Sequence, residues 1–164
     1  ALPCYTKPEN VALLAHFGVF NERECQARKE ILLEQYAKVI NIEAYTMYKM
    51  TAKMILPACV QFMNVLSESV KNKKDLNMTY DYEGSVLYKT GKLVDKAYSQ
   101  MGALEELRRQ AALMTDVEEQ TKYLHDAVLA KMEELRESLD SLELLVSSEY
   151  WPLPSYGDML FYVD

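Results

Sequence analysis

The chain has 164 residues, with 49% hydrophobic residues, 26% charged residues and a net charge of −7 at pH 7. This length suits one domain with a core of its own, and the composition argues against disorder as the overall state. Non-specific nucleic-acid binding needs Lys and Arg to neutralise phosphates, so this acidic chain is poorly suited to it. No apolar run approaches the ~20 residues of a membrane span. We therefore expect neither a nucleic acid nor a membrane as a partner.

The cysteines and the amino-terminal residues bear on the compartment. Cys4, Cys25 and Cys59 are odd in number and form no CxxC pair, which predicts reduced thiols in a cytoplasmic protein rather than disulfides or a zinc site. The first residues lack the basic start and apolar centre of a signal peptide. The sequence also lacks an initiator methionine, so we expect a processed or excised piece of a longer protein.

Two helices are expected in the first half of the chain. A short one spans about residues 8–17, with a capping box formed by Thr6 and Glu9 and a left-handed end at Gly18. A long one starts at Asn21, where Glu24 completes a second box, and its apolar period continues to about residue 73. Within it, Pro57 removes a hydrogen bond, which predicts a kink.

Two further helices are expected in the second half. Residues 74–82 show no helical period and are predicted to form a loop, and a third helix follows from about residue 83 to 114. Its glycines, Gly91 and Gly102, are unfavourable in a helix unless they allow close helix approach. The fourth helix starts at Thr115, with a capping box to Glu118, and ends near residue 147.

These elements predict an all-α fold. The turn between the third and fourth helices is very short, so these two helices should be antiparallel neighbours. The expected architecture is a bundle of about three long antiparallel helices and one short helix, with an extended C-terminal tail.

The tail, residues 150–161, contains two prolines that favour an extended path, and it carries the large apolar side chains Trp151 and Phe161. Exposed apolar groups of this size are a liability in water. We expect the tail to act as a latch on the bundle, or else to dock on another domain or subunit.

The histidines do not form the metal motif of helical bundles. A di-iron carboxylate bundle uses Glu-x-x-His units, but Leu13 and Lys122 stand three residues before His16 and His125. Each histidine is therefore interpreted as a surface or partly buried polar residue.

The remaining candidates for chemistry also have ordinary interpretations. Cys25 lies in a first helical turn, which favours a thiolate, but neighbouring Glu22 and Glu24 oppose that effect. Cys59 lies in an apolar stripe and is interpreted as inert core. Glu43 stands among apolar residues, and a pair with Lys or Arg at a helix interface is favoured over a site residue. We therefore predict no catalytic, cofactor-binding or metal-ligating residue in this chain.

Several strings resemble the C-terminal end of type III glutamine synthetases. They occur in order from one end of the chain to the other. The strings are ALP at residues 1–3, HFGVF at 16–20, NEREC at 21–25, RKEILLEQY at 28–36, INIEA at 40–44, ILPA at 55–58 and WPLPSYGDMLF at 151–161. Residues 74–115 match least distinctively.

The resemblance implies that residues 1–164 form a single helical C-terminal domain of a longer enzyme whose catalytic core is upstream and absent here. That enzyme would be a cytosolic homo-oligomer that joins ammonia to glutamate using ATP and Mg²⁺. This domain would bind no cofactor of its own. It would contact its own upstream catalytic domain and neighbouring subunits, and it would serve structure, oligomer assembly or regulation.

Two alternatives stay open. One is a free-standing helical interaction or regulatory module, and the other is a small helical enzyme with an unrecognised site. The abrupt start argues against the first, and the failed motif search argues against the second. The coding sequence upstream of Ala1 would discriminate between them.

Overall fold

The computed structural model describes residues 2–154 and 156–161, and every regular element among them is a helix, as predicted. Ala1 and Ser155, which belong to the strings quoted above, lie outside the described residues. The chain divides into two compact units, one from residues 1–44 and 107–130 and the other from residues 45–106 and 131–164. They are called unit 1 and unit 2 below, and each is described by itself.

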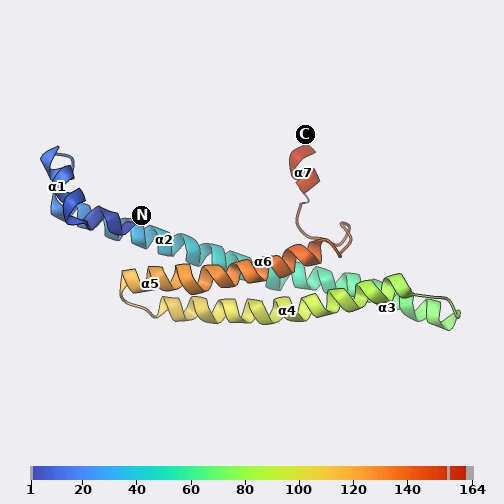
Figure 1. Cartoon of the computed structure of the whole chain (residues 1–164). Coiled ribbons are helices and arrows are strands. Elements are labelled where there is room, and N and C mark those ends of the chain that lie inside the picture. The colour runs from blue at the N-terminus through green and yellow to red at the C-terminus, as the bar shows by residue number, and fades with distance from the viewer. Residues whose placement is uncertain (1, 155, 162–164) are drawn as a thin grey trace. The chain divides into compact units, whose positions relative to one another are not determined.

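The elements follow the predicted order, with two short additions that were not predicted, η1 and α7. In chain order they are the 3-10 helix η1 (Leu2–Thr6), α1 (Pro8–His16), α2 (Glu22–Met50), the π-helix η2 (Thr51–Ile55), α3 (Leu56–Asp75), α4 (Asp81–Ala112), α5 (Val117–Tyr123), the π-helix η3 (Leu124–Val128), α6 (Leu129–Glu143) and α7 (Tyr156–Phe161) (Figure 1).

Two of the predicted helix boundaries in unit 1 are confirmed. The Asn21 N–H donates to Glu24 Oε2 at 2.7 Å, and the Glu24 N–H donates to Asn21 Oδ1 at 3.0 Å, which is the reciprocal capping box. Gly18 ends α1 with φ +66°, a conformation that favours glycine. Its N–H bonds to the Ala15 carbonyl at 3.0 Å, and the next N–H bonds to the Leu14 carbonyl at 2.9 Å, as in a Schellman cap.

The other two predicted caps are wrong. Thr6 ends η1, and the N-cap of α1 is Lys7, whose side chain makes no capping bond. At α5 the cap lies one residue later than predicted, because Asp116 Oδ1 accepts the Glu119 N–H at 2.8 Å while Thr115 precedes the cap. A carboxylate is the better acceptor at a helix start because the helix dipole favours negative charge there.

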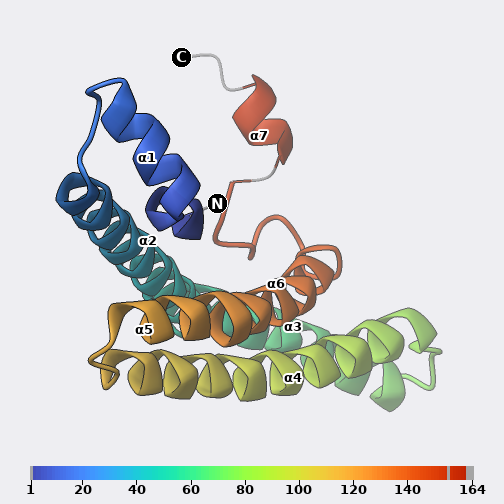
Figure 2. The ribbon, with the colours of Figure 1, turned by 60° about the vertical axis from the view of Figure 1, so that its left-hand side comes forward.

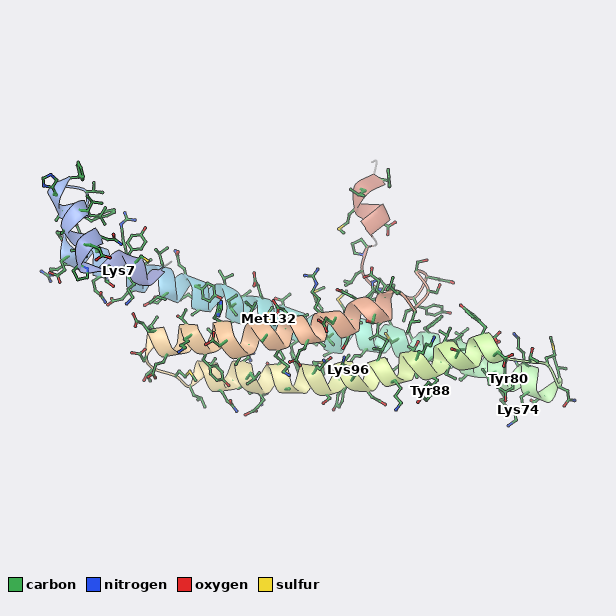
Figure 3. All side chains as sticks on the ribbon, in the orientation of Figure 1. Lys7, Lys74, Tyr80, Tyr88, Lys96 and Met132 are labelled. Carbon is green, nitrogen blue, oxygen red and sulfur yellow. The ribbon has the colours of Figure 1, made fainter. Side chains whose placement is uncertain are left out.

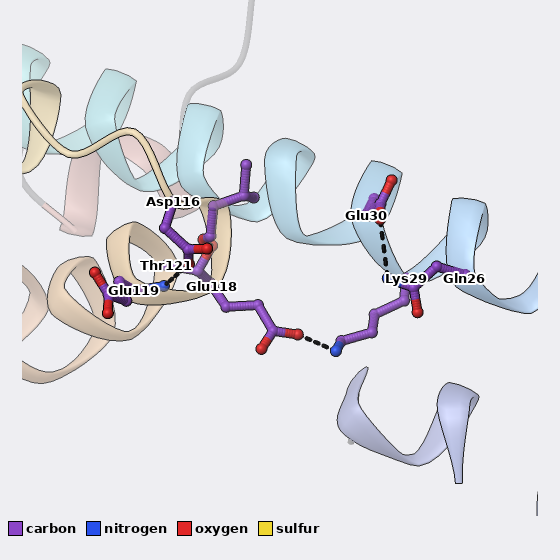
Figure 4. A network of polar contacts seen from close by, with 8 residues as sticks. Gln26, Lys29, Glu30, Asp116, Glu118, Glu119 and Thr121 are labelled. Atoms are coloured by element: carbon purple, nitrogen blue, oxygen red, sulfur yellow. Dashed lines mark hydrogen bonds and ion pairs between the residues drawn. The ribbon is translucent and has the colours of Figure 1, made fainter. Parts of the chain in front are cut away.

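Contacts from α2 and α4 to α5 organise the core of unit 1 (Figure 2). Lys29 forms an ion pair with Glu118, and the Thr121 hydroxyl lies 3.4 Å from the Leu33 carbonyl (Figure 4). In these two contacts the residue numbers increase together along α2 and α5, so the two helices run parallel. By contrast, Tyr123 donates to Gln110 at 2.7 Å and Gln120 donates to the Ala111 carbonyl at 2.9 Å. These numbers run in opposite directions, which confirms the predicted antiparallel pairing of α4 and α5.

A hairpin joins α3 to α4 in unit 2, and Figure 3 labels Lys74 and Tyr80 beside its loop. Asn77 closes α3 with φ 53°, and the next residue's N–H reaches back to the Lys73 carbonyl at 2.8 Å. Lys73 also pairs with Glu83, and its hydrogen bond lowers the pKa of the Glu83 carboxyl. The loop is shorter than predicted because the αL cap and this pair close it early.

A π-turn, η2, precedes Pro57. Buried Thr51, Ile55 and Cys59 are spaced by two steps of four, which would rotate the buried face by about 80° in a regular α-helix. A π-turn contains more residues than an α-turn and offsets this drift. The Leu56 N–H bonds to the Thr51 carbonyl, five residues back, and Pro57 falls in the first turn of α3, where its missing N–H costs little. The predicted irregularity at Pro57 therefore takes the form of a π-turn.

The core of unit 2 lies between α3, α4 and α6. Fully or nearly fully buried side chains line it: Ile55, Cys59, Phe62, Leu66, Ala97, Met101, Leu104, Leu135, Leu139 and Leu142. Ser138 donates to Gln100 Oε1 at 2.7 Å between α6 and α4. A Cβ on Gly91 would lie 3.4 Å from the Met63 methyl, whereas one on Gly102 would meet nothing within 4 Å. The Gly91 distance is an ordinary van der Waals contact with a flexible side chain, so close helix approach requires glycine at neither position.

The C-terminal tail follows the predicted latch only in its first part. The Tyr150 ring packs against the Phe62 ring of α3 with centroids 5.8 Å apart, and Trp151 is half-buried. The indole N–H of Trp151 is buried without a hydrogen-bond partner in the described part of the chain. Residues 156–161 form the helix α7 rather than continuing an extended path, and Phe161 is 80% exposed. Phe161 is therefore not a latch residue within this chain.

The corrected cap of α5 gives a direct test. We expect Asp116→Ala to lower the free energy of unfolding by about 1 kcal/mol, because the Glu119 N–H loses its acceptor. Thr115→Ala is the matched control and should change stability by less than about 0.5 kcal/mol. Urea unfolding followed by circular dichroism measures both, and a larger loss for Thr115→Ala would contradict the structure.

The tail gives a second test. Because Trp151 is only half-buried and its N–H lacks a partner, Trp151→Ala should cost about 1–2 kcal/mol rather than the 3–5 kcal/mol of a fully buried aromatic. Phe161→Ala, at an exposed site of the same tail, should leave the thermal melt of the 164-residue chain unchanged. Equal losses for both substitutions would show that the whole tail packs as one unit.

Candidate functional site

The three cysteines differ in accessibility. Cys25 and Cys59 are 0% exposed, while Cys4 is exposed. Burial raises the pKa of the Cys59 thiol to about 11, which keeps it protonated at neutral pH. A nucleophilic cysteine has to be ionised and reachable. The predicted core position of Cys59 is therefore confirmed, and Cys25 is buried as well.

The two histidines are both exposed side chains on unit 1. The His16 ring meets the Phe17 ring edge-on, with centroids 5.2 Å apart. His125 Nδ1 lies 2.9 Å from Asp126 Oδ1, and the centroids of the His125 and Tyr36 rings are 6.4 Å apart. The interpretation of both as surface polar residues is confirmed.

Glu43 does not lie at a helix interface, so the favoured sequence interpretation is wrong. It is exposed on α2, and no ion pair or hydrogen bond joins its side chain to another described residue. The apolar residues that flank it explain the error. Ala44 is buried whereas Ile42 is 63% exposed, so apolar sequence neighbours did not imply a buried setting.

No cluster of three or more His, Cys, Asp or Glu side chains could hold a metal ion within residues 2–154 and 156–161. None of the helices described there is long and apolar enough to span a bilayer. The sequence prediction of no metal-ligating residue stays a prediction for the chain as a whole.

A groove lies on unit 1 at the start of α2. Its lining is mostly apolar, with Phe20, Ala27, Ile31 and Leu32 among the residues that form it. The Arg28 guanidinium stacks over the Phe20 ring at 4.2 Å from the centroid. Such a cation–π contact holds the ring in place at the groove's edge. The arrangement suits packing against another surface better than bond-making chemistry. The sequence pattern did not predict the groove, because Phe20 lies before α2 and is not part of the apolar repeat of that helix.

Several known proteins are similar to this sequence over most of its length. A family model described as the glutamine synthetase C-terminal domain matches residues 1–74. A glutamine synthetase from Butyrivibrio fibrisolvens is 36% identical over 98% of this chain, a type-3 glutamine synthetase from Dictyostelium discoideum is 27% identical, and a glutamine synthetase from Bacteroides fragilis is 28% identical, each over the same share of the chain. The chain spans 23% of the length of these relatives.

The chain is thus an all-helical domain in its described residues, and it is similar to one part of these longer relatives. These matches support a C-terminal domain of the glutamine synthetase family. The sequence resemblance to the type III form is confirmed.

Thiol labelling tests the burial of the cysteines. At pH 8 a thiol with a pKa near 11 is ionised in only about one molecule in a thousand. We expect iodoacetamide to modify Cys4 alone in the native chain and all three cysteines in urea, as measured by intact mass. Cys4→Ser should abolish the native reaction. Rapid native labelling of Cys25 or Cys59 would show that this part of the core opens.

Proposed function

We propose that this chain is the non-catalytic helical part of a type III glutamine synthetase, and that the longer polypeptide joins ammonia to glutamate using ATP and Mg²⁺. The observation that carries the proposal is the alignment of 98% of the chain with 23% of relatives that are named glutamine synthetases. The longer protein is proposed to be a cytoplasmic homo-oligomer.

The placement of the candidate residues supports a structural or assembly role. Cys25 and Cys59 lie in the core, His16 and His125 pack against aromatic rings, and Glu43 stands alone on an exposed face. Catalysis needs several groups that converge on one reacting atom, and these five are not brought together. The described residues also offer no three-ligand cluster that fits Mg²⁺, so no step of the reaction is assigned to them.

The helices supply what a structural role requires. Unit 1 and unit 2 each have a core of their own, and each is tied by contacts between helices far apart in sequence, such as Leu33 with Thr121 and Gln100 with Ser138. Such a scaffold can hold an external surface in a fixed shape. The proposed contacts of that surface are the catalytic part of the same polypeptide and neighbouring subunits.

Activity measurements test the proposal. We expect the 164-residue chain to form no glutamine from glutamate, ammonia and ATP above a control without protein. The longer polypeptide that contains it should form glutamine in the same assay, and EDTA should stop the reaction. Turnover by the isolated chain, or a longer polypeptide without ligase activity, would each overturn the proposal.

A further inference from the structure

A groove on unit 2 lies between α4 and the end of α6. Leu93 and Leu145 form its half-buried apolar floor, and Leu144 beside them is 88% exposed. Among the described residues that line the groove, the charged ones are Lys89 and Lys92, and none is acidic. The groove is therefore an apolar surface bordered by positive charge.

Both lysines are placed to meet a negatively charged partner. Lys89 and Lys92 are exposed, and neither forms an ion pair with another residue that the structure describes. Lys92 Nζ lies 5.7 Å from the centroid of the Tyr88 ring one turn earlier on α4, and Tyr88 is 68% exposed (Figure 3). This cation–π contact holds the ammonium group beside the groove without neutralising its charge.

The helix α7 has the complementary character. Met159, Leu160 and Phe161 are three consecutive large apolar residues, and they are between 61% and 80% exposed. The charged residue of this helix is Asp158. From residue 137 to residue 164 the sequence has six Asp or Glu residues and no Lys or Arg. The chain therefore exposes both an apolar groove bordered by lysines and an apolar helix within an acidic segment.

We propose that the groove of one copy of this chain binds α7 of a second copy. Two observations select this occupant. Both surfaces are apolar and exposed, and exposed apolar patches mark sites of interaction. Their charges are opposite, which favours this pairing over contacts between like-charged surfaces. The proposal gives a contact between subunits a definite pair of surfaces, and in this respect it rests on the proposed function.

The anchoring of the tail favours a second copy over the same one. The Tyr150 ring packs against Phe62 of α3, and Trp151, which follows it, is half-buried. The groove is lined instead from α4 and the end of α6. The tail is thus held at a helix other than the two that line the groove. Binding of α7 within one copy is the alternative to be tested.

A single contact of this size is weak. The helix α7 has six residues, whereas a stable protein interface buries about 1,200–2,000 Å². Two copies that exchange α7 helices form the contact twice, and the second contact is then intramolecular, which strengthens the pair. The attraction between the lysines and the acidic tail falls as salt concentration rises. We therefore expect a reversible pair that is favoured at low salt.

Cross-linking between two copies of different mass tests the proposal without an activity measurement. In a Cys4→Ser background, one copy carries Ser141→Cys in the groove and the other carries Met159→Cys in α7. A short bismaleimide should join this mixed pair at least about tenfold faster than the control pair of Lys74→Cys with Met159→Cys, because the bound state holds the two thiols together. Lys74 is exposed at the hairpin and does not line the groove.

Charge reversal separates binding in the groove from non-specific association. Added to the Ser141→Cys copy, Lys92→Glu should slow cross-linking at low salt by about tenfold, because it sets like charges against the acidic tail. Lys96→Glu makes the same change of charge one turn further along α4, outside the groove. It should slow the reaction by less than about twofold, since solvent and salt screen a more distant charge.

Each outcome decides the question. Mixed-pair cross-linking no faster than the control overturns the proposal, as does equal slowing by Lys92→Glu and Lys96→Glu. A chain that carries both Ser141→Cys and Met159→Cys and forms an internal cross-link, without mixed pairs, also overturns it, because α7 then binds its own groove. Leu144→Cys replaces Ser141→Cys if circular dichroism shows that the first variant does not fold. Glutamine formation by the longer polypeptide is measured separately, so failure of the proposed function is distinguished from failure of this contact.

Discussion

The packing of unit 2 depends on keeping one apolar face in phase through η2 and α3, residues 51–75. Regular α-helical geometry cannot do this when buried residues are spaced by consecutive steps of four, as Thr51, Ile55 and Cys59 are. The π-turn of η2 takes up the extra residue. The π-turn ends just before α3, which places Pro57 in the first turn of that helix, where a missing N–H costs little. One local irregularity therefore keeps the buried residues in phase and accommodates the proline.

The helices also show what sequence patterns could and could not reveal. Periodicity predicted the helices well because buried side chains recur every three or four residues over many turns. The Asn21 and Glu24 box was found because both partners are strong capping residues at the correct spacing. The boxes at Thr6 and Thr115 were not formed, because a nearby residue competed for each helix start. Asp116 offered the better acceptor in one case; in the other, Thr6 ends η1, which leaves extended Lys7 as the N-cap of α1.

Burial of single residues was harder to predict than helix position. Glu43 has apolar neighbours in sequence, but a helix turns by about 100° per residue, so neighbours point to different sides. Because α2 also carries exposed apolar residues such as Ile31 and Ile42, periodicity alone could not tell its buried face from its exposed one. The contacts from α5 decide the matter, since Thr121 and Glu118 reach Leu33 and Lys29. The sequence does not reveal which distant helix will make them. For the same reason, the groove at Phe20 could not be predicted.

Exposed apolar side chains on α2 set how much free energy the domain gains when another surface covers them. Side chains such as Ile31 and Ile42 gain roughly 1.5–3 kcal/mol each when fully removed from water, before the cost of ordering is subtracted. A contact that forms only with the folded domain stabilises it by the free energy of docking. The same free energy stabilises the bound arrangement of whatever surface it covers. A change in the core of unit 1 that reshapes α2 would therefore act on the bound surface through lost docking energy.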